Sequence, residues 1–86
     1  MPHMLATLRN VALITIKEVL ENDAKFHAEH GIFLEHLWQN ADDSNEALFL
    51  FRIDNVDSTR KLIDSLHEAA LKDDPNVNLP DIKYLE

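Results

Sequence analysis

Three polar side chains in one short stretch have the chemistry of an acid/base site. Asp23, His27 and His30 are spaced four and three residues apart, in a run whose apolar residues recur with helical periodicity. A helix places residues at this spacing on one side, and here that side also carries the apolar residues that must face a sheet. Imidazole titrates near neutral pH, so a histidine held there can give or take a proton. The sequence therefore predicts a polar cluster beneath this helix.

The strands that follow the helix supply the other side of the predicted site. His36 and Trp38 alternate along one strand, and Phe49 and Phe51 along the next. Small-molecule pockets are mostly apolar clefts with a few convergent polar groups. We predict that Asp23, His27 and His36 are catalytic. We also predict that a small, partly apolar ligand contacts His30, Trp38, Phe49 and Phe51.

A β-hairpin over Ile32–Asp54 must position these strand residues. Its two runs are rich in aromatic and branched side chains, and they flank Ala41–Asn45, a polar segment typical of hairpin loops. The matching of charged and apolar residues favours the pairs Gln39–Leu48, Trp38–Phe49, His36–Phe51, Glu35–Arg52 and Leu34–Ile53. In this register His36 and Trp38 point toward the helices.

The same register gives the hairpin a second apolar face, formed by Leu37, Leu48 and Leu50. A lone domain with helices on one side of its sheet needs only one apolar face. The chain's own helices cannot cover the second one. We therefore predict a homodimer that forms through Leu37, Leu48 and Leu50.

The whole chain reads as strand, helix, two strands, helix, strand. We expect a first strand from Met4 to about Leu13, a helix that begins with a Thr15–Glu18 capping box and ends at Gly31, and a second helix from an Asp54 or Asn55 cap to about Lys72. Asp81–Leu85 suits a short edge strand. This βαββαβ order predicts one ferredoxin-like α+β domain over residues 1–86, with a four-stranded antiparallel sheet and two helices on one face.

Two segments, FLFRIDNVDSTRKLIDS and the ending LPDIKYLE, resemble the dimeric α/β-barrel superfamily. The resemblance implies that two sheets pack face to face across a two-fold axis and that a ligand cleft lies between sheet and helices. The superfamily includes antibiotic-biosynthesis and haem-degrading monooxygenases, polyketide cyclases and isomerases. Its face-to-face packing would account for the apolar face deduced above.

Metal and cofactor sites have weaker support in the sequence. Haem-degrading members of the superfamily use an Asn, a Trp and a His, and Asn10, Trp38 and His67 offer these residue types, although Trp38 comes earlier in the chain than the pattern has it. Ligation of a metal by Asp23, His27 and His30 or His36 is a further alternative. We predict no metal and no cofactor.

Composition excludes several classes of partner. The 86 residues carry a formal net charge of −8, which disfavours binding to nucleic acid or to an anionic membrane. The chain has no cysteine, so thiol catalysis and disulfides are excluded. Its longest apolar run, Val11–Ile16, is too short for a membrane span or an export signal, so we expect a cytoplasmic protein.

Two functional hypotheses follow from these patterns. In the first, the homodimer holds a small molecule between sheet and helices and performs cofactor-free acid/base or monooxygenase-type chemistry. In the second, the protein is a non-catalytic binding or assembly module whose histidines are structural, with His30 bonded to carbonyls of the last helical turn. An enclosed pocket bordered by Asp23, His27 and His36 would favour the first hypothesis.

Overall fold

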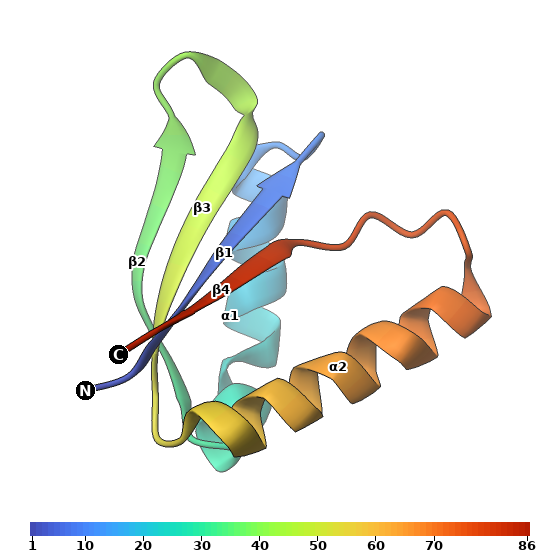
Figure 1. Ribbon diagram of the computed structural model, residues 1–86. Coiled ribbons are helices and arrows are strands. Elements are labelled where there is room, and N and C mark those ends of the chain that lie inside the picture. Colours follow the sequence, from blue (N-terminus) through green and yellow to red (C-terminus); the bar gives the residue numbers. More distant parts are fainter.

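The computed structural model describes residues 1–86 and has the predicted βαββαβ order (Figure 1). Its elements are β1 (His3–Arg9), α1 (Leu13–Glu29), β2 (Ile32–Asn40), β3 (Asp43–Ile53), α2 (Val56–Asp73) and β4 (Asp81–Leu85). The strands form one antiparallel sheet in the order β2-β3-β1-β4. This is the α+β, ferredoxin-like arrangement. Neither helix is both long enough and apolar enough to cross a membrane.

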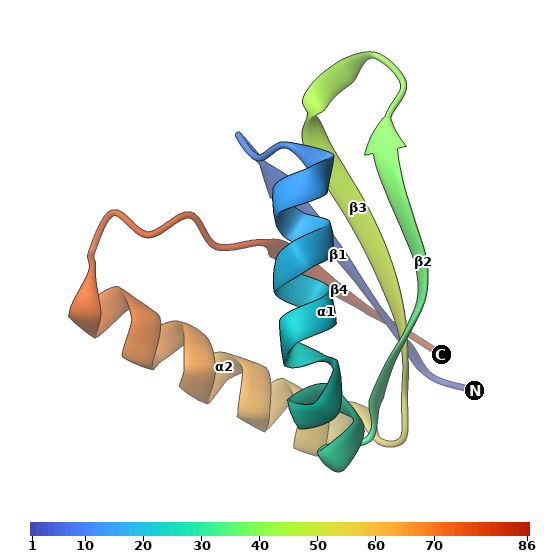
Figure 2. The same ribbon diagram turned by 180° about the vertical axis from the view of Figure 1, so that it is seen from behind.

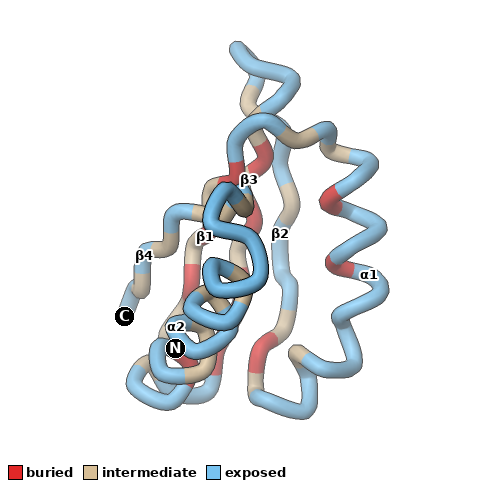
Figure 3. Tube along the Cα trace, turned by 90° about the vertical axis from the view of Figure 1, so that its right-hand side faces the viewer, coloured by how far each residue is buried: buried red, intermediate tan, exposed pale blue.

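The core lies between the sheet and α1. Alternate residues of β1 and β3 are buried, because each strand turns every second side chain toward the helices (Figure 3). From the helix, Ile16 and Leu20 complete this layer. The buried apolar residues are Met4, Ala6, Leu8, Ile16, Leu20, Ile32, Ala47, Phe49, Phe51 and Ile53.

The two helices cover the sheet to different extents. α1 packs along β2 and β3 (Figure 2). α2 packs against the core through Val56, Leu62 and Ile63 in its first half, and then runs away from the sheet (Figure 1). Leu66 in the second half is 42% exposed, because this part of α2 has no sheet beneath it (Figure 1).

The boundary between β1 and α1 differs from the prediction. Asn10 has a positive φ of 59°, which ends β1 at Arg9 rather than near Leu13. Short polar side chains such as that of Asn tolerate this left-handed conformation. The helix then begins at Leu13, and the Ile16 amide already donates to the carbonyl of Ala12. Thr15 therefore lies inside the first turn, and the predicted capping box is not formed.

Two other predicted helix ends are confirmed. Gly31 follows α1 with a φ of +71°, and a Cβ at this position would come within 2.5 Å of a carboxylate oxygen of Asp54. Only glycine fits such a conformation and such a close approach without strain. At the start of α2, the side chain of Asn55 accepts a hydrogen bond from the amide of Ser58.

The hairpin pairs in a different register from the predicted one. Leu34 opposes Phe51, whereas His36 opposes Leu50, so Glu35 is an extra residue in β2. An extra residue of this kind is a β-bulge, which shifts the alternation of side chains beyond it. The loop is also shorter than predicted, because Asn40 pairs with Asp43.

The bulge reverses the faces of the outer half of β2. Leu34 lies on the helix side with Phe51, but His36 and Trp38 oppose Leu50 and Leu48 and therefore lie on the outer face. The predicted positions of His36 and Trp38 under the helices are wrong for this reason. The predicted position of Leu37 on the outer face is also wrong, because Leu37 opposes buried Phe49 and faces α1.

Candidate functional site

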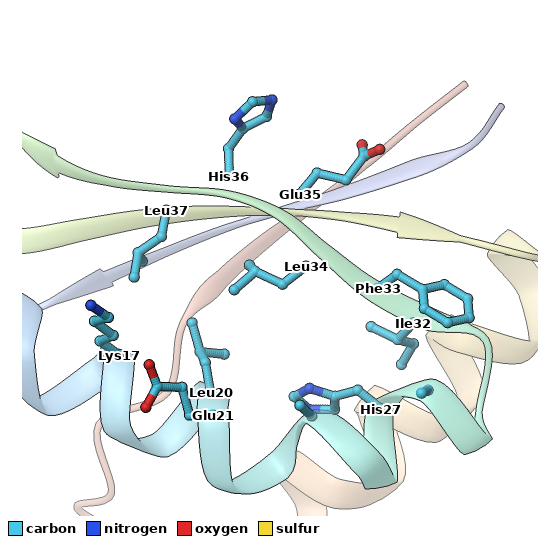
Figure 4. A pocket seen from close by; sticks show the side chains of 12 residues that line it. Lys17, Leu20, Glu21, His27, Ile32, Phe33, Leu34, Glu35, His36 and Leu37 are labelled. Atoms are coloured by element: carbon cyan, nitrogen blue, oxygen red, sulfur yellow. The ribbon is translucent and has the colours of Figure 1, made fainter.

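A groove of about 620 Å³ lies between α1 and β2, one of the two edge strands of the sheet (Figure 4). Its walls are mostly apolar and come from Leu20, Ala24 and Ala28 of α1 and Ile32, Leu34 and Leu37 of β2. The helix also contributes three polar side chains, those of Lys17, Glu21 and His27. A hollow of this size with few polar groups matches the dimensions of a small-molecule site.

Small residues on α1 keep the groove open. Ile16 and Leu20 fill the contact between the helix and the sheet, but the next two turns present Ala24 and Ala28 to β2. A methyl group leaves unfilled the space that a Leu side chain would occupy. The spacing of these two alanines, four residues apart, is the sequence signal for this wall, and the sequence analysis missed it.

His27 lies in the groove as the sequence predicted for the helix. Its ring is half-buried and meets the ring of Phe51 edge to face, with 5.5 Å between centroids. The ring makes no hydrogen bond to another residue. Burial lowers the pKa of His27 below 6.5, and the neighbouring Asp23 carboxylate opposes this shift. A neutral imidazole without a partner is therefore available to a ligand in the groove.

The other two polar residues of α1 do not join His27 inside the groove. Asp23 is exposed, and it acts on His27 through its charge. His30 is also exposed, and its Nδ1–H donates to the carbonyl of Phe26 at 2.9 Å while its ring packs on the Phe26 ring. This is the hydrogen bond to a carbonyl of the last helical turn that the non-catalytic hypothesis predicted for His30.

His36 and Trp38 lie together, but on the other side of the sheet. Their rings stack with 4.9 Å between centroids and an angle of 14° between planes. His36 is among the residues that line the groove, but its side chain points away from α1 (Figure 4). The predicted cluster of Asp23, His27 and His36 around one cavity is therefore not formed.

Phe49 and Phe51 belong to the core beneath the groove. Both are buried, and their rings meet edge to face with 5.6 Å between centroids. Neither residue lines the groove. A contact between these rings and a ligand would need the core to open.

The alternatives with a metal or haem find no assembled site. No three His, Cys, Asp or Glu side chains are placed so that they could hold a metal ion. Of the residue types that resemble a haem site, Trp38 lies on the outer face, whereas α2, which carries His67, packs against the core on the opposite face.

His27→Leu should leave the free energy of unfolding unchanged or slightly raised at pH 7, since it removes no hydrogen bond and adds apolar contact with Phe51. It should also change the response to pH. The unfolded chain binds a proton on His27 more readily than the folded chain, so this residue lowers stability progressively as pH falls below 6.5. In the variant, the free energy of unfolding should therefore fall less steeply below pH 6.5 than in the wild-type protein.

Urea titrations from pH 5 to 8 measure both effects. The matched control is His67→Leu on α2, a histidine that does not contribute to the pKa shift of His27, and it should keep the dependence on pH due to His27. A loss of about 1–3 kcal/mol in His27→Leu at pH 7 would instead show that the ring belongs to a satisfied polar network.

Comparison with known proteins identifies the fold. No protein-family model matches the chain, and a search of curated proteins finds no match. Among solved structures, a candidate antibiotic biosynthesis monooxygenase from Deinococcus radiodurans superimposes with a TM-score of 0.63. The two share 19% sequence identity over 100% of this chain and 91% of the other. The fold is common to both at this level of identity, whereas activity does not follow from fold alone. The chain therefore has the ferredoxin-like fold of its monooxygenase-like structural neighbour, as the sequence resemblance predicts.

Proposed function

We propose that the protein is a homodimer that binds a small, partly apolar molecule in the groove of each protomer and exchanges a proton with it through His27. The observation that carries the proposal is an apolar groove that holds one half-buried imidazole without a hydrogen-bond partner. The size of the groove, about 620 Å³, suits a molecule of one to three rings rather than a polymer.

The outer face of the sheet supports the homodimer. Leu5, Leu48 and Leu50 are half-buried there, beside exposed Trp38, and both helices pack on the other side. Only 11 of 86 residues are buried within one protomer, so the core is thin for an independent domain. Pairing of two outer faces would bury this surface. Leu37, which the sequence analysis assigned to the interface, is not part of it.

His27 supports proton transfer as the chemistry of the site. Because its pKa is lowered, the imidazole is neutral at pH 7 and can accept a proton from a phenol or from carbon beside a keto group. The likeness to a candidate monooxygenase adds oxidation of such a molecule by dioxygen as the reaction class, with one oxygen atom entering the product and the other leaving as water. His27 is the acid/base candidate of the original three that this proposal retains.

A non-catalytic assembly module is the second candidate. It is favoured by the separation of Asp23, His27 and His36 and by the hydrogen bond of His30 to its own helix. Under this hypothesis the groove binds nothing and the outer face alone carries the function. Ligand binding in the groove separates the two candidates.

Titration with the fluorophore anilinonaphthalene sulfonate tests the groove. Ala24→Trp should fill the groove and weaken binding at least tenfold, whereas Ala69→Trp, on an exposed position of α2, should leave the affinity unchanged. In ¹H–¹⁵N NMR spectra of the wild-type protein, the amide signals of Ala24 and Ala28 should shift when the fluorophore binds. Equal affinity in all three proteins, or no saturable binding, would contradict the proposed site.

A further inference from the structure

One edge of the sheet is free along the groove. β2 pairs with β3 on one side only, so backbone N–H and C=O groups along its other side have no strand partner. The groove follows six consecutive residues of this edge, Ile32–Leu37. The strand is also long and apolar, with Leu34 44% and Trp38 46% exposed. Such an edge is a template for pairing with another strand.

The sequence of this edge is nearly the same from both directions. Phe33-Leu34-Glu35-His36-Leu37-Trp38 reads aromatic, Leu and charged from one end, and aromatic, Leu and titratable base from the other. Because of the bulge, residues related by this symmetry also lie on the same face of the sheet. Leu34 and Leu37 face α1, whereas the other four residues lie on the outer side. The centre of symmetry is the peptide bond between Glu35 and His36.

We infer that β2 pairs antiparallel with β2 of a second copy, about a two-fold axis between Glu35 and His36. In this register Phe33 opposes Trp38, Leu34 opposes Leu37 and Glu35 opposes His36, and each pair occurs twice. Aromatic pairs stabilise facing strands, and a carboxylate oxygen can accept a hydrogen bond from an imidazole N–H. Glu35 bonds His3 through Oε1, so Oε2 is free for the imidazole of the second copy.

The bulge makes the edge selective for a second copy. A regular strand alternates strictly, so it could match the faces of β2 on one side of Glu35 but not on the other. A strand with the same bulge matches both halves. The paired edge would also bring Leu34 and Leu37 of the second copy beside the groove, whose open side lies along β2 (Figure 4). Two chains would then complete each site.

Disulfide cross-linking tests this register, because the chain has no cysteine of its own. Leu34→Cys and Leu37→Cys are prepared separately, mixed and oxidised with copper phenanthroline. Directly opposed residues of antiparallel strands lie within reach of a disulfide, whereas residues three positions apart do not. The mixture should give a covalent dimer on a non-reducing gel, and each variant alone should stay monomeric on it.

A second pair protects the test against a local effect of either substitution. Phe33→Cys and Trp38→Cys should behave in the same way, and Ala69→Cys mixed with Leu34→Cys should not cross-link. No cross-link in either mixture would overturn the inference, as would equal cross-linking of single variants. The Leu34–Leu37 cross-link is independent of the outer-face dimer, because both residues face α1. Formation of both contacts would give a tetramer made of two outer-face dimers.

Discussion

Leu50→Asp is expected to halve the molar mass of the protein in solution. Leu50 lies at the middle of the outer face, opposite Leu5 on one side and His36 on the other. In a face-to-face dimer the new carboxylate would be desolvated without a partner, which costs several kcal/mol by the usual estimate for an unpaired buried charge. Each protomer of the dimer would carry this cost, and the sum would exceed the free energy of association.

Light scattering at low micromolar concentration measures the effect against the 9.9 kDa chain mass. Leu71→Asp is the matched control, because Leu71 is exposed on α2 and lies away from the outer face. It should keep the wild-type mass. Thermal unfolding should also become less dependent on protein concentration in Leu50→Asp. A Leu50→Asp protein with the wild-type mass would remove the outer face as the interface.

Phe51→Ala should lower the free energy of unfolding by about 3–5 kcal/mol, the usual range for a buried aromatic residue. Phe51 is 3% exposed and its ring meets those of Phe49 and His27. Small domains have about 5–15 kcal/mol of stability in total, so the variant should be largely unfolded near 50 °C. Urea titration at 25 °C measures the difference.

Phe26→Ala is the matched control for this change, since Phe26 is exposed on α1 and its ring meets only those of His27 and His30. It should cost about 1 kcal/mol or less, as expected for a substitution near the surface. The pair also decides whether Phe51 contacts a ligand, as the sequence analysis predicted. A Phe51→Ala protein that keeps its stability but loses its affinity for the fluorophore would place this ring in the binding site.

The sequence was sufficient for the order of elements and for their type. Helical periodicity placed His27 on the side of α1 that faces the sheet, and the structure confirms this. Gly31 marked the end of α1 because glycine adopts a positive φ without strain, and Asn55 marked the start of α2 because its side chain can accept a hydrogen bond from a backbone amide of the first turn. These signals depend only on residues close in the sequence, so they can be interpreted without knowledge of the rest of the fold.

The hairpin register could not be predicted from the same kind of signal. Phe33 and Leu34 are adjacent apolar residues, and so are Leu37 and Trp38, so either face of β2 could be the buried one. A bulge of one residue then decides between them. Two of the seven predicted site residues, His36 and Trp38, lie on this strand, so their placement failed while that of His27 did not.

The bulge also bears on how the chain tolerates a change in length. Deletion of the single codon for Glu35 would restore strict alternation, and His36, Leu37 and Trp38 would keep their present faces, because they already pair with consecutive residues of β3. The lining of the groove would not change, but the edge of β2 would become regular. A regular edge can pair with any regular strand, so the extra residue protects the protein from aggregation along this edge.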